Sequence, residues 1–325
     1  MKKRLLSMMM VLLVLTMGLY ANGQDETNAE DSSNWPEKEI FINVHAGSGN
    51  LDTAMRLIAP FISERLGVDV LVQNKPGGSQ AVSQVATQGE PADGYTFQTF
   101  TGSTSFSMAS GAIPFGPEDW SVVSSIQREP ASIAVLADSP LKTIDDLVAA
   151  LKEDPDSYII GGYQSASFMR YVYYKLQELT GFNAKWIPID TTDEVATALL
   201  GKHIDVAIMT PSTTGTAVSR GDVRLLGIAT AERSPNYPDV PTFREQGIDI
   251  VEILWRGLGV KKGTDSAIIQ KMADTISEIT QTEEWKEIQE KYNQENDPVS
   301  PQQLDERLAN EVAGRTKFLQ DLGLK

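Results

Sequence analysis

Short runs of β-branched and aromatic residues alternate with helical apolar patterns along most of the chain, and this alternation limits the fold more than any other feature. Strand-like runs occupy residues 40–44, 68–73, 95–100, 122–126, 133–136, 158–160, 185–189, 204–209 and 252–260. Helical spacing of apolar residues marks 51–66, 143–151, 168–179, 192–200, 265–280, 283–292 and 301–322. Such alternation is typical of βαβ units around largely parallel sheets, so the sequence predicts an α/β fold.

The order of these runs also predicts how the chain is divided. The strand-like runs on either side of residue 130 should carry the chain into a second lobe, and the run that begins at Glu252 should bring it back. We expect lobe 1 to comprise residues 36–138 and 251–325, lobe 2 to comprise 139–250, and a hinged cleft to lie between them. About 290 residues are enough for two lobes of ordinary size.

The N-terminus has the features of an export signal. A basic start precedes an apolar run at residues 5–19, which is short for a bilayer-crossing helix, and small residues follow at Ala21 and Gly23. We expect residues 1–23 to be a cleaved signal peptide that takes the protein to the periplasm or otherwise outside the cytoplasm. An uncleaved anchor is the alternative. The polar residues 24–35 are expected to form a flexible tether.

Composition excludes several classes of function. The chain has no cysteine, which excludes disulfides, thiolate metal ligands and a lipid-modified N-terminal cysteine. Removal of the signal peptide takes away three positive charges and no acid, which changes the net charge from −16 to −19. Such a charge disfavours nucleic acid and anionic lipid. It also repels an anionic ligand at long range, so a site for a carboxylate needs strong local donors.

Glycine-rich and hydroxyl-rich loops follow several of the predicted strands, at residues 46–52, 101–105, 161–167 and 209–214. Open α/β sheets bind ligands at the carboxyl ends of their strands. In the first loop, glycines would let the backbone approach a ligand, and the start of the next helix would present N–H groups to an anion. The alternative is that each loop is a tight turn with a helix cap, such as Asn50 or Asp52.

Motifs of enzymes and nucleotide-binding proteins are missing or incomplete. Gly47-x-Gly49 is followed by Asp52 where a dinucleotide fingerprint has its third glycine, and neither a phosphate loop nor a zinc-protease motif occurs. We therefore expect no catalytic residue, no metal site and no cofactor. An exported hydrolase or isomerase that uses His45, Ser48 and Asp52 is one competing class, and a ligand-dependent sensor is another.

Several segments together resemble one family, the periplasmic receptors of the tripartite tricarboxylate transporters, also called Bug-type receptors. Asn74-Lys75-Pro76-Gly77-Gly78 looks like the family's Asn-Arg/Lys-Pro-Gly-Ala-Gly turn, and residues 91–96 are similar to its Pro-Asp-Gly-Tyr-Thr motif. Residues 200–205, 221–226 and 233–247 resemble three further signatures in the right order. The similarity runs from Trp35 to the C-terminus.

The resemblance implies a two-lobed type II periplasmic-binding-protein fold that closes on a small organic acid or amino-acid-like ligand. It also implies a receptor that passes this ligand to membrane permease subunits, and we expect it to act as a monomer. Family pocket segments correspond to residues 46–52, 101–104, 161–167 and 188–192. Together with the loops above, they select as ligand-binding candidates Ala46, Gly47, Ser48, Gly49, Asn50, Asp52, Thr101, Gly102, Ser103, Thr104, Gln164, Ser165, Ala166, Ser167, Asp190, Thr191, Asp205 and Thr210.

This chain departs from the family pattern in two places. The first loop reads Gly47-Ser48-Gly49-Asn50 where the family has Pro-Gly-Gly, and residues 189–192 replace its Tyr-Lys/Arg-Gly-Gly turn. The replacement brings Asp190, whose charge would disfavour a second or third ligand carboxylate. We therefore expect a ligand with fewer negative charges than citrate, with an amine or hydroxyl that Asp190 accepts from.

Overall fold

The computed structural model describes residues 34–47, 49–163, 165, 167–292, 294–297 and 299–324. The chain divides into two compact units, 1–35 and 36–325, and the second of these is described below. The predicted signal peptide and most of the predicted tether lie outside the described residues. Within the described part, no helix is long and apolar enough to cross a membrane.

The first sheet has five strands in the order β2-β1-β3-β10-β4. β1 pairs in parallel with β2 and β3, whereas β10 is antiparallel to β3 and β4. The strands are β1 (Ile40–Val44), β2 (Val70–Asn74), β3 (Thr96–Thr101), β4 (Trp120–Pro130) and β10 (Ile253–Lys261).

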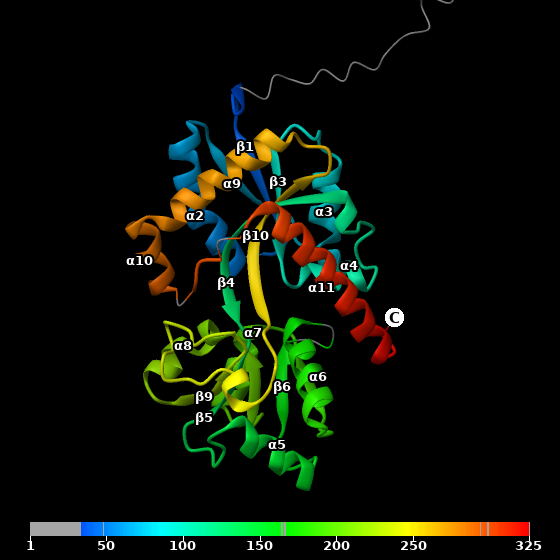
Figure 1. Ribbon diagram of the computed structural model, residues 1–325, viewed down its shortest axis with the longest axis vertical. Coiled ribbons are helices and arrows are strands. Elements are labelled where there is room, and N and C mark those ends of the chain that lie inside the picture. Colours follow the sequence, from blue (N-terminus) through cyan, green and yellow to red (C-terminus); the bar gives the residue numbers. More distant parts are fainter. Residues whose placement is uncertain are drawn as a thin grey trace, which may run out of the picture. The chain divides into compact units, whose positions relative to one another are not determined.

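The second sheet has the order β7-β6-β8-β5-β9 and repeats the same arrangement of parallel and antiparallel neighbours. Figure 1 shows the two sheets in separate halves, with β4 and β10 side by side between them. The strands are β5 (Ser132–Leu136), β6 (Ile160–Tyr163), β7 (Trp186–Ile189), β8 (Val206–Met209) and β9 (Val223–Ile228).

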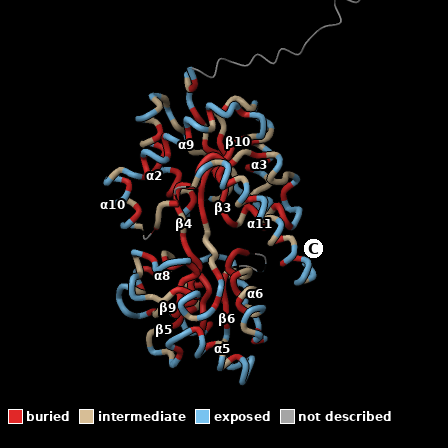
Figure 2. The backbone as a smooth tube through the Cα atoms, in the orientation of Figure 1, coloured by how far each residue is buried: buried red, intermediate tan, exposed pale blue. Residues whose placement is uncertain are grey.

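Helices cover the faces of both sheets, and Figure 2 shows that burial is concentrated in the strands while the outer faces of the helices are exposed. Lobe 1, the first sheet with its helices, contains α2 (Asn50–Leu66), α3 (Ala81–Gln88), α4 (Thr104–Ala109), α9 (Ser266–Gln281), α10 (Glu283–Lys291) and α11 (Pro301–Asp321). Lobe 2, the second sheet with its helices, contains α5 (Ile144–Glu153), α6 (Phe168–Thr180), α7 (Thr192–Leu200) and α8 (Pro211–Ser219).

Local signals in the sequence explain where several helices begin and end. Gly67 ends α2 in the left-handed conformation, with φ of 72°, which glycine adopts without a steric penalty. Ser300 begins α11 with the predicted capping box to Gln303. Thr143 does the same for α5 with Asp146. These helix ends are therefore determined locally.

The structure adds elements that the periodicity did not mark, namely α3, α4, α8 and β9. α4 and α8 are rich in serine and threonine, so their sequences read as polar turns. Several of their serine and threonine residues, such as Thr104, Ser105 and Thr214, are buried by the rest of the fold. Tertiary burial thus outweighs weak intrinsic helix propensity.

The division into lobes differs from the expectation at one strand. We expect residues up to 138 in lobe 1 from the sequence, but β5 pairs with β8 and β9 in the second sheet. The strand lies immediately after β4, and the chain therefore enters lobe 2 before residue 138. The other limits of the lobes remain a prediction.

Candidate ligand-binding site

A cavity of about 760 Å³ lies against loops of both lobes at the carboxyl ends of β1, β3 and β6. Its volume is in the range of small-molecule sites. Lobe 2 contributes Tyr163, Ser165 and Ser167. The larger part comes from lobe 1, namely His45, Ala46, Leu51, Gly77, Ser79, Gln80, Thr101, Ser103, Phe106, Ser107, Ser110, Leu254 and Arg256.

The loop between β1 and α2 presents its backbone rather than acidic side chains. Gly49 is the N-cap of α2 with φ of 152°, and no described side chain caps this helix, so the alternative of a cap by Asn50 or Asp52 is wrong. The Asp52 carboxylate accepts hydrogen bonds from Arg56 Nε at 3.0 Å and Asn74 Nδ2 at 2.8 Å. Asp52 therefore fixes the loop and does not line the cavity.

The turn that resembles the family motif supports this loop. Asn74 Nδ2 also donates to the Ala46 carbonyl at 3.0 Å, which ties the end of β2 to the cavity wall. Ser79 and Gln80 follow with positive φ angles of 50° and 83°, a conformation that non-glycine residues adopt only when their surroundings hold them. Gln80 Oε1 accepts from Thr104 Oγ1 at 2.9 Å, so the two neighbouring loops brace each other.

The loop after β3 is held by its own hydroxyl groups. Thr101 Oγ1 accepts from the Ser103 amide at 3.1 Å, and Thr104 Oγ1 accepts from the Thr101 amide at 3.0 Å. Gly102 donates its N–H to the Trp255 carbonyl at 3.1 Å, and a Cβ at Gly102 would lie 3.3 Å from Leu254. Thr101 and Ser103 line the cavity, whereas Gly102 and Thr104 do not line it and instead hold the loop in place through their hydrogen bonds.

The loop after β6 is the contribution of lobe 2. Ser167 is the N-cap of α6, since its hydroxyl accepts from the Arg170 amide at 3.2 Å and donates to the Tyr163 carbonyl. Gln164 and Ala166, also predicted here, lie outside the described residues, as does Ser48 in the first loop. Ser165 and Ser167 are thus the predicted lobe 2 residues that the structure places at the cavity.

A buried ion pair borders the cavity and was missed from sequence. Arg256 on β10 is 5% exposed, and its Nη1 donates to Glu129 Oε1 on β4 at 2.8 Å. Glu129 also accepts from Ser212 at 2.9 Å and Gln294 at 3.2 Å. Burial alone would raise the pKa of the Glu129 carboxyl, but Arg256 and the hydroxyl groups of Thr210 and Ser212 hold it below its usual value. An arginine within the otherwise apolar and glycine-rich residues 253–260 was the available signal.

His45 faces the cavity as a neutral ring. Burial lowers its pKa to about 4, against the opposing effect of a hydrogen bond between Nδ1 and the Thr99 carbonyl at 3.0 Å. The Asp52 carboxylate is bonded to Arg56 and Asn74 and does not orient this imidazole. The described residues therefore do not show the His–Asp arrangement that the competing enzyme hypothesis requires.

The remaining candidates lie around the cavity or away from it. Asp190 follows β7, and its charge, after burial, contributes to a raised pKa of Tyr163. Thr191 caps α7 by accepting from the Glu194 amide at 3.2 Å. Asp205 lies at the amino end of β8 and accepts from the Ile159 amide at 2.8 Å, which fixes a loop.

Of the predicted residues, Ala46, Thr101, Ser103, Ser165 and Ser167 line the cavity. The lining does not include Gly47, Gly49, Asn50, Asp52, Gly102, Thr104, Asp190, Thr191, Asp205 or Thr210.

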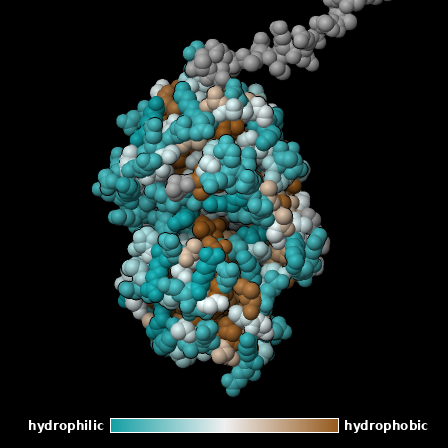
Figure 3. All heavy atoms as spheres, in the orientation of Figure 1, coloured by the Kyte–Doolittle hydropathy of each residue, from teal (hydrophilic) through white to brown (hydrophobic). Residues whose placement is uncertain are grey.

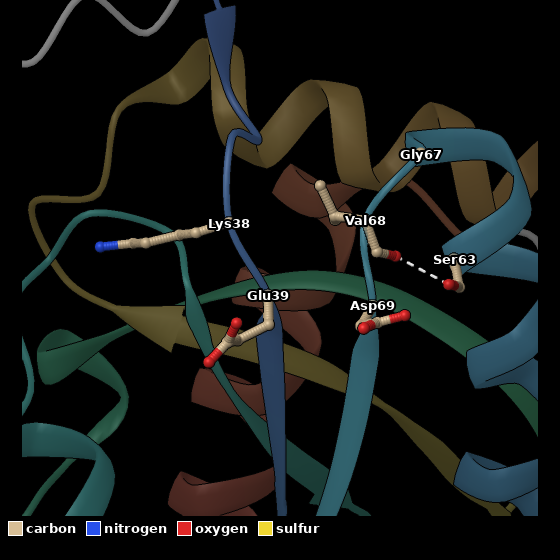
Figure 4. A pocket seen from close by; sticks show the side chains of 6 residues that line it. All are labelled: Lys38, Glu39, Ser63, Gly67, Val68 and Asp69. Carbon is tan, nitrogen blue, oxygen red and sulfur yellow. Dashed lines mark hydrogen bonds between the residues drawn. The ribbon is translucent and has the colours of Figure 1, made fainter.

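A second hollow of about 360 Å³ lies at the opposite end of the first sheet, beside the amino ends of β1 and β2. Figure 4 shows Lys38 pointing away from Asp69, and Ser63 Oγ donating to the Val68 carbonyl at 2.7 Å. No group of three or more potential metal ligands occurs among the residues that the structure describes. The larger cavity is the better candidate site because it meets the carboxyl ends of strands from both lobes.

These features define a two-lobed solute-binding protein. Residues 54–324 match the family described as "Tripartite tricarboxylate transporter family receptor", and the chain belongs to this family. A curated relative, the "UPF0065 protein in gbd 5'region" of Cupriavidus necator, is 28% identical over 292 residues, or 89% of each chain.

Two solved structures show the same fold. A TctC solute-binding protein from Polaromonas is 24% identical with a TM-score of 0.79, covering 88% of this chain and 99% of that chain. A protein of R. palustris solved with adipate is 23% identical with a TM-score of 0.75, covering 89% of this chain and 98% of that one.

Proposed function

We propose that this protein is an extracytoplasmic receptor that captures a small organic acid between its lobes and delivers it to membrane permease subunits. The observation that carries the proposal is the composition of the cavity wall. Its described lining residues include hydroxyl-bearing side chains, small residues such as Ala46 and Gly77, and Arg256, and they include no aspartate or glutamate. In a chain with a net charge of −16, a cavity lined in this way favours an anionic ligand.

Delivery requires that the ligand changes the shape of the receptor. A ligand shifts an equilibrium between open and closed forms only if it contacts both lobes more favourably in the closed form. Tyr163 and Ser167 from lobe 2 face the same cavity as Thr101 and Ser103 from lobe 1. Figure 3 shows hydrophobic side chains gathered in the band between the halves that hold the two sheets, where closure would act.

Asp190 supports a ligand of low charge. Its carboxylate is close enough to Tyr163 to contribute to the raised pKa of the phenol, and Tyr163 lines the cavity. A ligand carboxylate on this side would be repelled, whereas an amine or hydroxyl would be favoured. We therefore propose a ligand with fewer negative charges than citrate.

We further propose that the protein has no catalytic activity, needs no cofactor and acts as a monomer. Its family supports transport, and the neutral His45, which no described carboxylate orients, supports binding over hydrolysis. The basic and apolar N-terminal sequence supports export with cleavage after Gly23. The adipate in the R. palustris structure supports an organic acid as the ligand class.

A thermal-shift screen against mono-, di- and tricarboxylates, amino acids and neutral metabolites tests this proposal. A ligand at 100 times its dissociation constant should stabilise the protein by about 2.7 kcal/mol. We expect acids of low charge to raise Tm and to be recovered unchanged. A converted ligand would support the enzyme class instead, and a panel in which no acid raises Tm would rule out the organic-acid assignment.

The Asp190→Gly variant tests the role of this acid in ligand selection. We expect it to gain affinity for dicarboxylates, measured by isothermal titration calorimetry, because a repulsive charge is removed. An unchanged ligand set with unchanged affinity would show that Asp190 does not act in selection.

A further inference from the structure

We propose that Arg256 binds a carboxylate of the ligand directly and that this single cation restricts the site to acids with one carboxylate in the cavity. The inference deepens the proposed function and rests on it. Arg256 would be the residue that determines specificity, and Glu129 would be the residue that positions it.

Arg256 is held between two neighbouring strands at the cavity wall. In the register of the sheet it lies opposite Thr101 of β3 and Gln127 of β4. Thr101 lines the same cavity, so the arginine and the hydroxyl-rich loop present their polar groups to one space. A side chain that is 5% exposed in this position has little freedom to turn toward bulk solvent.

The guanidinium of Arg256 has more hydrogen-bond donors than its described partners use. It carries five N–H groups, and among the described residues its hydrogen bond is the one from Nη1 to Glu129. The arginine is nevertheless part of the cavity wall. A planar guanidinium with open donors is suited to two parallel hydrogen bonds with a carboxylate.

The charges around the cavity leave room for one ligand carboxylate. Glu129 is 1% exposed and already offsets part of the charge of Arg256. His45 is neutral because burial lowers its pKa to about 4, so the described lining residues include no second cation. A second carboxylate would lose its water without gaining a partner, which is unfavourable in a partly buried site.

The rest of the lining suits an uncharged ligand body. Leu51, Phe106 and Leu254 provide apolar surface, while Ser103, Ser107 and Ser110 provide hydroxyl groups. The predicted ligand is thus an acid with one carboxylate at Arg256 and an apolar, hydroxyl-bearing or amide-bearing remainder.

Glu129 also connects Arg256 to lobe 2. Its Oε1 accepts from Arg256 and its Oε2 accepts from Ser212 of α8, 2.9 Å away. A carboxylate bound at Arg256 would therefore act on a network that already bridges the lobes. Glu129 has no open face on the cavity wall, which agrees with a positioning role.

Calorimetry with three compounds on one carbon skeleton tests the inference: succinate, its half-amide and its diamide, and the same series for adipate. We expect the half-amide to bind wild-type protein at least as tightly as the dicarboxylate. We expect the half-amide to bind about 10- to 100-fold more tightly than the diamide, because only the half-amide has a carboxylate that can form a charge-assisted hydrogen bond with Arg256.

Arg256→Met alone leaves Glu129 buried without its partner and can prevent folding. The double variant Arg256→Met with Glu129→Gln removes both charges and should fold, as checked by circular dichroism. We expect it to bind half-amide and diamide equally. Arg256→Lys keeps the charge but loses the planar pair of donors, so it should retain part of the preference for half-amide over diamide. This variant tests the role of Arg256 if the double variant does not fold.

Arg128→Met is the matched control. Arg128 is adjacent to Glu129, pairs with Glu295 at 3.2 Å and does not line the cavity, so its replacement should leave the affinities unchanged.

A folded double variant, or a lysine variant, with the full wild-type preference for half-amide over diamide would overturn the role of Arg256. A wild-type preference for the dicarboxylate of more than about tenfold over the half-amide would overturn the one-carboxylate rule, at about 1.4 kcal/mol per tenfold. A wild-type protein that binds no acid in this series or in the broader screen would instead overturn the proposed function.

Discussion

The two lobes share one arrangement of strands but have different interiors. In both sheets three parallel strands are followed by an antiparallel strand and then a fifth strand, and β10 of the first sheet takes the position of β5 in the second. In lobe 1, Asn43, Ser83, Thr87 and Gln98 form a buried hydrogen-bonded layer between α3 and the sheet. The corresponding interior of lobe 2 consists largely of aliphatic and aromatic side chains.

This difference shows that two lobes with the same strand order can contribute unequally to the cavity wall. Lobe 1 supplies the larger part of the cavity wall, including Arg256, whereas lobe 2 supplies Tyr163, Ser165 and Ser167. Buried polar layers hold their partners in one geometry because a broken hydrogen bond inside a protein is costly. We infer that lobe 1 acts as the preformed receptacle and that lobe 2 completes it on closure.

The two lobes also contact each other through apolar and charged side chains. The main apolar cluster of lobe 2 continues into lobe 1 through Phe106 of α4 and Phe318 of α11. Arg315 of α11 lies 3.7 Å from the ring centroid of Tyr171 and 2.9 Å from Glu252. This contact limits how far the lobes can be treated as independent units.

The largest expected effect follows from breaking this contact. Arg315 is 3% exposed, and Arg315→Met would leave the Glu252 carboxylate without its buried partner, although Lys175 remains 3.0 Å away. We expect the free energy of unfolding to fall by about 3–5 kcal/mol, measured by urea denaturation. Lys317→Met, on the exposed side of the same helix, should leave the midpoint nearly unchanged. A small effect of Arg315→Met would mean that the lobes are stabilised separately.

A pH dependence should arise at the same contact. Burial raises the pKa of Glu311 from its ordinary value of 4.5 to about 7, with Arg315, Trp255 and Arg307 opposing the shift and Glu252 adding to it. Because the folded state holds this proton more tightly, the contribution of Glu311 to stability is fully present below about pH 4.5 and is lost as the pH rises through about 7.

The Glu311→Gln variant should remove this decline, a difference of up to about 3 kcal/mol at neutral pH. Denaturation curves at several pH values would measure it, with Glu306→Gln on the exposed face of α11 as the control. A wild-type profile that does not decline relative to Glu311→Gln would contradict the assignment.

A third prediction tests whether the buried polar layer of lobe 1 contributes to stability in a way that the interior of lobe 2 does not. Thr87 Oγ1 accepts from Asn43 Nδ2 at 2.9 Å and donates to Gln98 Oε1 at 2.9 Å. Thr87→Val would leave the Asn43 amide unpaired, at a cost of about 1–3 kcal/mol in the free energy of unfolding. Thr197→Val, on an exposed turn of α7 in lobe 2, should have a much smaller effect. Equal effects would show that the polar layer does not stabilise lobe 1.

The smallest effect is expected at Ser167, which both caps α6 and lines the cavity. Ser167→Ala should cost about 1 kcal/mol of stability through loss of the cap. It should also weaken ligand binding, because a lobe 2 hydroxyl is lost. Ser167→Asp restores the cap but adds a negative charge, so it should regain stability and bind acids more weakly still. Unchanged affinity in both variants would restrict Ser167 to a structural role.

Much of the fold could be predicted because its signals are local. The apolar periodicity of α2 and α11 and the caps at Gly67 and Ser300 lie within a few residues of the features they determine. The failures also have a physical cause. α4 and α8 have weak helical sequences and depend on distant contacts, and β5 joins the second sheet through pairing that no local pattern encodes.

The same division applies to the site. The sequence identified loops at strand ends, and Ala46, Thr101, Ser103, Ser165 and Ser167 from these loops line the cavity. It did not show that Asp52 would be bonded to Arg56 and Asn74 rather than open to the cavity. The orientation of the Asp52 side chain depends on partners from other parts of the fold, and the sequence of the loop does not reveal these partners.

By itself, the sequence determined the α/β class, the family and the positions of loops that line the cavity, because periodicity, caps and ordered motifs act over short stretches of chain. The tertiary structure alone decided that Arg256, more than 100 residues along the chain from Glu129, forms a buried pair with it at the cavity. That pairing depends on β4 and β10 lying side by side, and the strength of a buried charge depends on its surroundings rather than on its neighbours in sequence.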